Sequence, residues 1–171
     1  MRLRIVACEI FFRELCHLAA RSARKVDVEF LPKGLHDQGG GAMRERLQAA
    51  IDATDPGRHD AVALAYGLCN NGLVGLRARA LPLVLLRAHD CITAFLGSRA
   101  RYARYFDERP GTLDGDLGLL HRLVDGPWDS ADFLVLQPGE RAAATLGDEV
   151  IVAETPPFRT GDHGVSAVRT N

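Results

Sequence analysis

The sequence predicts an α/β protein built on a three-layer, mostly parallel open sheet of about five to six strands, doubly wound in the Rossmann-like or flavodoxin-like manner. Segments typical of strands and of helices alternate strictly over roughly the first 108 residues, and such alternation favours parallel strands joined by helical crossovers. Residues 60–68 are apolar almost throughout. This is the pattern of a central parallel strand that is covered on both faces.

The first half of the chain predicts two strands and two helices. Residues 3–8 are apolar and rich in branched side chains, which predicts a strand, and residues 11–22 carry apolar side chains at helical spacing. Residues 26–31 alternate apolar with acidic residues, as in a strand nearer the sheet edge. A glycine-containing loop over residues 33–43 then leads into a predicted helix at 44–53.

The next segments continue the alternation. After the central strand we expect a short helix that ends at Arg79, and then a fourth strand at residues 81–86. Pro82 must stand at the beginning of that strand, because proline cannot donate a ladder hydrogen bond. Asp90 is a good N-cap for a long helix predicted at residues 91–107.

The last third is less regular. Residues 109–131 are rich in glycine and proline around a short helical stretch at 117–124, and we interpret them as an insert that could serve as a lid. Strands are expected at 132–136 and 149–153. We therefore expect a single domain over residues 1–156, followed by a loose C-terminal tail at 157–171.

Composition limits the class of protein. The chain has 171 residues, 47% apolar residues, 25% charged residues and a formal net charge of −1, which is ordinary for a soluble globular domain. That charge gives no support to nucleic-acid or anionic-membrane binding. Charged residues interrupt the apolar N-terminus before a signal-peptide core forms, and no run approaches the ~18 apolar residues of a membrane span. We expect a cytoplasmic protein.

Three of the four cysteines close predicted strands: Cys8, Cys69 and Cys91. In an open parallel sheet, the residues beyond the carboxyl ends of the strands share one crevice, where such folds bind ligands. The three thiols could therefore converge. All three are predicted at or before the first turn of a helix, where the helix dipole favours the thiolate form. The alternative for each is a small buried apolar side chain.

Several chemistries fit such a set. Three thiolates with His36 match a tetrahedral zinc site, whereas three thiolates alone leave a position open for water or substrate. The same cysteines could hold an iron–sulfur cluster with one exposed iron. A metal-free enzyme is also consistent, with Cys91 as nucleophile and His36 or His89 as general base.

Polar residues surround the same strand ends. We expect Cys91, His89 and Glu9 to be catalytic, with Glu9 as a proton donor. Four further residues could orient a polar or anionic substrate: Lys33, Asn70, Asn71 and Arg87. Salt bridges and turn or cap roles are the structural alternatives for them. Standard nucleotide-binding, zincin and α/β-hydrolase motifs are absent from the sequence.

Four ordered segments, VACEIFFRELC, EFLPKGLHD, YGLCNNGLVGL and RAHDCITAFLGS, resemble the domain of unknown function 1638 family over roughly residues 2–112. The resemblance implies a soluble prokaryotic protein, often encoded near corrinoid-dependent methyltransferase systems. Five residues match the family's motif positions: Cys8, His36, Cys69, His89 and Cys91. After Thr112 the chain departs from the family, because LDGDLGLLHRL replaces an aromatic-rich stretch.

The leading hypothesis is a metal-dependent enzyme, with zinc or an iron–sulfur cluster on Cys8, Cys69 and Cys91 and with His36 or His89 completing or supporting the site. Methyl-group or one-carbon metabolism is its expected context. Methyl transfer through a zinc-activated thiol and lyase or hydration chemistry at an exposed iron are the two candidate reactions. The alternatives are a non-catalytic accessory protein that binds a metal, a cofactor or a corrinoid methyltransferase partner, and the metal-free cysteine enzyme.

Overall fold

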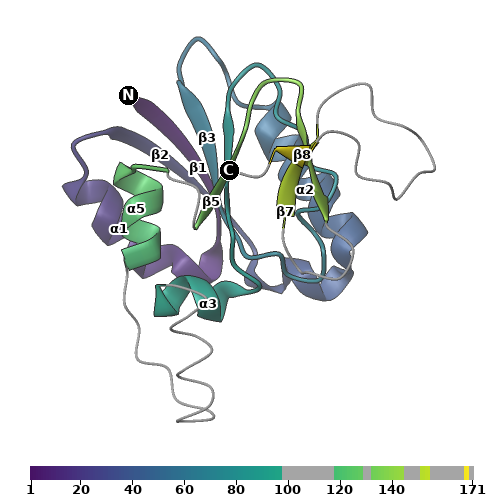
Figure 1. Ribbon diagram of the computed structural model, residues 1–171. Coiled ribbons are helices and arrows are strands. Elements are labelled where there is room, and N and C mark those ends of the chain that lie inside the picture. Colours follow the sequence, from purple (N-terminus) through teal and green to yellow (C-terminus); the bar gives the residue numbers. More distant parts are fainter. Residues whose placement is uncertain (98–117, 129–131, 145–150, 155–167, 170–171) are drawn as a thin grey trace.

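The computed structural model describes residues 1–97, 118–128, 132–144, 151–154 and 168–169. Its centre is a five-stranded sheet in the order β2-β1-β3-β4-β5 (Figure 1). The first four strands run parallel and the fifth runs antiparallel to β4. The strands are β1 (Arg2–Cys8), β2 (Lys25–Leu31), β3 (Ala61–Ala65), β4 (Leu83–Leu86) and β5 (Phe133–Leu136). The predicted mostly parallel α/β sheet is confirmed.

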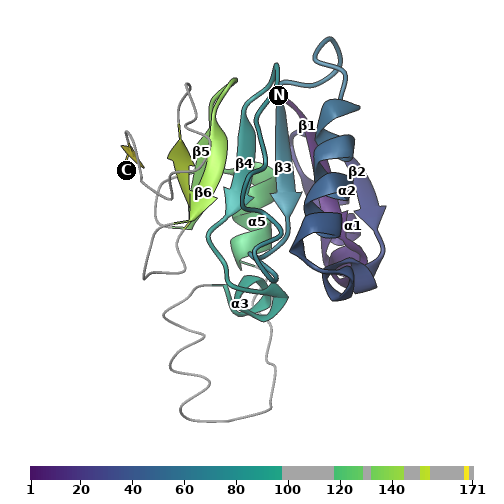
Figure 2. The ribbon, with the colours of Figure 1, turned by 90° about the vertical axis from the view of Figure 1, so that its right-hand side faces the viewer.

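Helices cover both faces of this sheet and give the fold three layers. Helices α1 (Phe12–Arg21) and α5 (Gly118–Asp125) pack against each other on one face, and α2 (Gly40–Asp52) covers the other (Figures 1 and 2). Helix α5 matches the short helix predicted at 117–124. The crossover from β1 to β2 and the crossover from β2 to β3 therefore lie on opposite faces.

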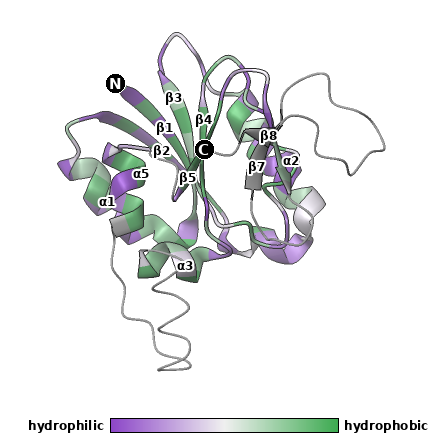
Figure 3. Ribbon diagram, in the orientation of Figure 1, coloured by the Kyte–Doolittle hydropathy of each residue, from purple (hydrophilic) through white to green (hydrophobic). Residues whose placement is uncertain are grey.

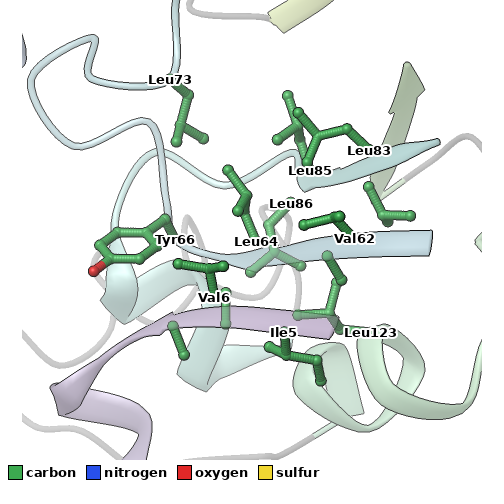
Figure 4. Close-up of a cluster of buried hydrophobic side chains, with 14 of the residues drawn as sticks. Ile5, Val6, Val62, Leu64, Tyr66, Leu73, Leu83, Leu85, Leu86 and Leu123 are labelled. Carbon is green, nitrogen blue, oxygen red and sulfur yellow. The ribbon is translucent and has the colours of Figure 1, made fainter. Parts of the chain in front are cut away.

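The core lies around the central strands. Every residue of β3 and β4 is buried, and the hydropathy colours of Figure 3 show β3 as an apolar strand. Figure 4 shows their side chains packed with Ile5 and Val6 of β1 and with Leu123 of α5. Each such aliphatic side chain stabilises the fold by about 1.5–3 kcal/mol through burial. Strand β2 is only partly buried, as its alternating sequence predicted.

The connection between β3 and β4 differs from the prediction. The expected helix that ends at Arg79 is absent from this described segment, which forms turns instead. Its backbone pairs with residues around a second sheet: Gly75 N–H donates to the Ala142 carbonyl over 2.8 Å, and Ala78 N–H donates to the Glu140 carbonyl over 2.9 Å. Gly75 has a φ of 91°, which interrupts a right-handed helix. The prediction of a helix was wrong because the N–H groups of Gly75 and Ala78 bond to carbonyls far along the chain, and a local sequence pattern does not reveal such partners.

The second sheet consists of three antiparallel strands, β6 (Arg141–Ala144), β7 (Ile151–Glu154) and β8 (Val168–Arg169). Strand β7 corresponds to the strand predicted at 149–153, but it belongs to this small sheet rather than to the main one. Strand β8 falls within the segment expected to be a loose tail. The other residues of 157–171 lie outside the described residues.

The helix after β4 is short in the described structure. Helix α3 (Cys91–Leu96) ends at Gly97, whose left-handed conformation with a φ of 81° is typical of a helix C-terminus. A helix was predicted over 91–107, and its residues from 98 onward lie outside the described residues, as does most of the insert proposed as a lid. None of the described helices is long and apolar enough to cross a membrane.

Candidate functional site

The strand order reverses beside β1, and this places two cysteines together. The chain moves from β1 outward to β2 and then returns across β1 to β3. The crevice between the carboxyl ends of β1 and β3 is therefore the topological switch point, where open α/β sheets bind ligands. Cys8 is the last residue of β1, and Cys69 lies in the loop that follows β3. The predicted strand-end positions thus flank this crevice.

Backbone hydrogen bonds join the β3 loop to the β4 loop that leads to the third cysteine. Leu68 N–H donates to the Ala88 carbonyl over 2.7 Å, and Cys69 N–H donates to the His89 carbonyl over 3.0 Å. Cys91 follows two residues later, as the first residue of α3. We call Cys8, Cys69 and Cys91 the three-cysteine site.

Burial raises the pKa of every thiol in the three-cysteine site. Desolvation is the largest cause for each of them, and for Cys69 it raises the pKa to about 12. The thiols also act on one another: negative charge on Cys91 and Cys8 raises the pKa of Cys69, and charge on Cys8 raises the pKa of Cys91. The three side chains therefore share one electrostatic environment.

The expectation that helix N-termini favour the thiolates holds in position only for Cys91, the first residue of α3, where backbone N–H groups lower the thiol pKa but burial outweighs them. Cys8 precedes only a single 3₁₀ turn, η1 (Glu9–Phe11), and Cys69 lies in a turn rather than a helix. A backbone hydrogen bond from Ile10 lowers the pKa of Cys8, but burial outweighs it. In this state the protein holds the thiols protonated at neutral pH.

The Cys69 loop has an uncommon backbone. Cys69, Asn70 and Asn71 have φ angles of 39°, 59° and 59°, in the left-handed region that costs an L-residue about 1–2 kcal/mol. Asparagine tolerates this conformation better than most residues. The loop is fixed from outside as well, since a Cβ on Gly40, the first residue of α2, would stand 2.4 Å from the Asn70 carbonyl oxygen. Strain of this kind concentrates at functional sites.

Tyr66 belongs to the site, although the sequence did not single it out. It directly follows β3, is only 3% exposed, and its hydroxyl has no hydrogen-bond partner among the described residues. Desolvation raises its pKa most, followed by the charges of Cys8 and Cys69. A tyrosine at the end of a wholly apolar strand is the sequence signal that could have identified it, since a buried hydroxyl needs a partner.

Apart from Cys8, the predicted residues of the first two strand ends are exposed: Glu9, Lys33 and His36. His36, in η2 (Lys33–Gln38), is paired with Asp37 through Nε2 and Oδ1 at 3.1 Å, and its side chain is 53% exposed. It is not among the groups that shift the pKa of the three thiols. Glu9 is exposed and accepts a hydrogen bond from the Lys33 backbone N–H over 3.4 Å. The Lys33 side chain is exposed.

The predicted residues of the β3 and β4 loops lie beside the thiols along the chain. Asn70 and Asn71 are exposed, whereas Arg87 and His89 are partly buried. Arg87 N–H donates to the Asp132 carbonyl over 2.8 Å and ties the β4 loop to β5. Asp90 is the predicted N-cap: its Oδ1 accepts from Thr93 N–H over 2.8 Å and from the Thr93 hydroxyl over 2.9 Å.

Within the described parts of the chain, no three His, Cys, Asp or Glu side chains are grouped so that they could hold a metal ion. The ionisation of one thiol would affect the pKa of another. The three thiols nevertheless do not form a group that converges on one point. What this edge of the sheet offers is soft sulfur ligands, an unpartnered hydroxyl donor and flanking polar side chains.

Residues 30–113 match the model of a family described as a protein of unknown function, DUF1638. The match includes four of the residues predicted for the site: His36, Cys69, His89 and Cys91. Cys8 lies before it, although the resemblance in sequence was expected to begin near residue 2. No curated protein and no solved structure matches the chain.

Proposed function

This chain belongs to the DUF1638 family, whose description names no reaction, and from the chain's own residues we propose a metal-dependent enzyme that acts on a small molecule. Its metal would be held by the three-cysteine site. One observation carries the proposal: three thiols follow three neighbouring strands at the carboxyl edge of the sheet, beside its topological switch point, and ionisation of one would raise the pKa of another.

The charges around the thiols support a bound cation. All the charges that shift the pKa of the three thiols belong to acidic groups: the thiols themselves, Glu9 and Asp90. Each raises a thiol pKa, so the thiolates disfavour one another while the site is metal-free. A metal ion would reverse this balance, because it stabilises thiolates and releases their protons when it binds.

We propose an iron–sulfur cluster in preference to a single zinc ion. A mononuclear site requires sulfurs that converge on one atom, and no such group is present among the described residues. A cluster spreads its cysteine ligands over several irons, so the sulfurs need not meet at one point. His36, paired with Asp37, would have to turn away to complete a zinc site.

Three cysteine ligands would leave one iron of a cubane-type cluster without a protein ligand. A cluster held in this way would supply Lewis-acid chemistry toward an oxygen atom of a substrate. Lyase or hydration chemistry on a small polar or anionic molecule is the reaction class that we propose.

Residues beside the thiols would serve that chemistry. We propose Glu9 and His89 as the groups that move protons, and Lys33, Asn70, Asn71 and Arg87 as the groups that orient the substrate. A place in methyl-group or one-carbon metabolism, in the cytoplasm and beside a corrinoid methyltransferase partner, is proposed from the family resemblance. The metal-free cysteine enzyme has less support, because burial keeps the pKa of Cys91 raised and the nucleophile protonated.

Metal analysis of the anaerobically purified full chain tests the proposal. We expect stoichiometric iron and acid-labile sulfide in the wild type, and loss of both in Cys8→Ser, Cys69→Ser and Cys91→Ser. Cys16→Ser is the matched control, because Cys16 is exposed on α1. Zinc in the absence of acid-labile sulfide would indicate a mononuclear zinc site instead of a cluster. The absence of both iron and zinc would overturn the proposal.

A further inference from the structure

The Tyr66 hydroxyl is a buried polar group whose partner is missing. The residue is only 3% exposed, and its hydroxyl oxygen makes no hydrogen bond within the part of the chain that the structure describes. Buried tyrosine hydroxyls usually have a partner, and leaving one without costs about 1–3 kcal/mol. Phenylalanine would fill the same space without that cost. We therefore infer that the hydroxyl has a function other than stabilising the fold.

The position of the hydroxyl points to the three-cysteine site. Tyr66 directly follows the central strand β3, and Figure 4 shows its ring at the strand end, with the oxygen pointing away from the apolar side chains. The charged groups that act on it include Cys8 and Cys69, the two cysteines that flank the switch point. No sulfur is within hydrogen-bonding reach of the oxygen, since it has no partner of any kind.

We propose that the Tyr66 hydroxyl donates a hydrogen bond to a carbonyl or carboxylate oxygen of a small molecule bound between the ends of β1 and β3. The inference rests on the proposed function for the location of that molecule. It adds the chemical class of the ligand and the residue that recognises it.

The surroundings make Tyr66 a donor rather than a base. Burial and the charges of Cys8, Cys69, Glu29 and Glu9 all raise its pKa, so the phenol keeps its proton at neutral pH. A phenol that keeps its proton can donate its O–H to an acceptor atom, and carbonyl and carboxylate oxygens are strong acceptors.

Fluorine NMR can observe this hydrogen bond directly. The chain contains three tyrosines, Tyr66, Tyr102 and Tyr105, so protein labelled with 3-fluorotyrosine gives few signals, and Tyr66→Phe identifies the Tyr66 signal by its loss. Acetate and acetamide are the probes, one for a carboxylate oxygen and one for a neutral carbonyl. We expect at least one probe to shift the Tyr66 signal in a saturable way.

Tyr66→Phe provides the matching binding measurement. We expect the Kd of the probe to rise about 10- to 100-fold, as for loss of one hydrogen bond to a charged or strongly polar group. The free variant should melt at or above the temperature of the wild type, because it buries no unsatisfied hydroxyl. Its iron and sulfide content should equal that of the wild type.

The inference would be overturned by no saturable shift with either probe, by unchanged probe affinity in Tyr66→Phe, or by a lower melting temperature of the free variant. Loss of iron in Tyr66→Phe would also overturn it, since the hydroxyl would then serve the metal rather than a ligand. If the wild type holds no metal but the Tyr66 signal still responds, the proposed cluster fails while the ligand site stands.

Discussion

Gly67 lies so close to Asp90 that a Cβ on the glycine would stand 2.5 Å from the Asp90 Cα and 2.7 Å from its backbone nitrogen. Gly67 lies in the loop that contains Cys69, and Asp90 is the N-cap of α3, which begins at Cys91. This contact therefore joins the segments that carry the two thiols. The neighbouring obstacles are backbone atoms, which cannot turn away as a flexible side chain could. The spacing between these two thiols therefore depends on the absence of a side chain at residue 67.

Gly67→Ala should separate the two loops and destabilise the protein. We expect a loss of about 2–3 kcal/mol in the free energy of unfolding, typical of steric overlap in a packed region, together with loss of bound metal. Urea denaturation and metal analysis measure the two effects. Gly41→Ala is the control: a Cβ at this position would have nothing within 4 Å, so the helix preference for alanine should stabilise α2 by about 0.5–1 kcal/mol. Equal free energies of unfolding and equal metal contents in the two variants would show that a side chain at residue 67 does not disturb the contact with Asp90.

Asp90 has two separable effects, one on the helix and one on the thiols. Asp90→Ala should cost about 1 kcal/mol, because it removes the N-cap acceptor for Thr93. Asp90→Asn retains a side-chain oxygen and should cost less. Urea denaturation of both variants measures the difference, and equal losses would show that the cap does not depend on this oxygen.

Both Asp90 variants should also make Cys91 more reactive. The charge of Asp90 is the second-largest cause of the raised pKa of Cys91, after burial, so its removal increases the thiolate fraction. Alkylation of the metal-free protein by iodoacetamide, followed residue by residue by mass spectrometry, should be faster at Cys91 in Asp90→Asn than in the wild type. An unchanged rate would show that Asp90 does not act on this thiol.

The raised pKa of Cys69 predicts how stability depends on pH in the metal-free protein. Its thiol has a pKa of about 12 when folded, against 9.0 as the ordinary value expected when unfolded. Below pH 9.0 the thiol is protonated in both states and contributes no pH dependence. Between 9.0 and about 12 only the unfolded thiol ionises, so the free energy of unfolding falls as pH rises.

Cys69→Ser should remove that part of the alkaline loss of stability. Urea denaturation of the wild type and the variant across this pH range, in the presence of a chelator, gives the comparison. Cys16→Ser, at an exposed position of α1, should leave the wild-type curve unchanged. If the free energy of unfolding fell equally with pH in the wild type and in Cys69→Ser, the result would contradict the burial of this thiol.

The left-handed backbone at Cys69 predicts a conflict between stability and function. Cys69→Ala and Cys69→Gly both remove the thiol, but only glycine adopts a φ of 39° without a side-chain clash. We expect Cys69→Gly to be more stable than Cys69→Ala by about 0.5–1 kcal/mol, after the entropy cost of glycine is counted, and both to lose the metal. Thermal unfolding of the two metal-free variants measures the difference, and equal stability would show that the loop carries no strain.

Local patterns predicted the parts of the fold that depend on neighbours in sequence. The run of apolar residues predicted β3, and the Asp90 side chain predicted the start of α3, because burial periodicity and helix capping act within a few residues. The strand-end positions of Cys8, Cys69 and Cys91 followed from the same patterns.

Non-local contacts explain what the sequence did not reveal. The turns before Arg79 replace a helix because Gly75 and Ala78 bond to residues far along the chain, at Ala142 and Glu140. The antiparallel direction of β5 and the separate sheet of β6 to β8 depend on pairing partners that no short segment specifies. Tyr66 was missed for a related reason: only the assembled fold leaves its hydroxyl without an acceptor.

The central claim is that Cys8, Cys69 and Cys91 together hold one cluster with an open iron. Mössbauer spectroscopy of the anaerobic full chain, loaded with ⁵⁷Fe, tests it most directly. The account predicts a cluster in which one kind of iron differs from the rest and responds to acetate or acetamide, with the same spectrum in Cys16→Ser. Absence of cluster iron, or irons that are all equivalent and indifferent to both probes, would contradict it.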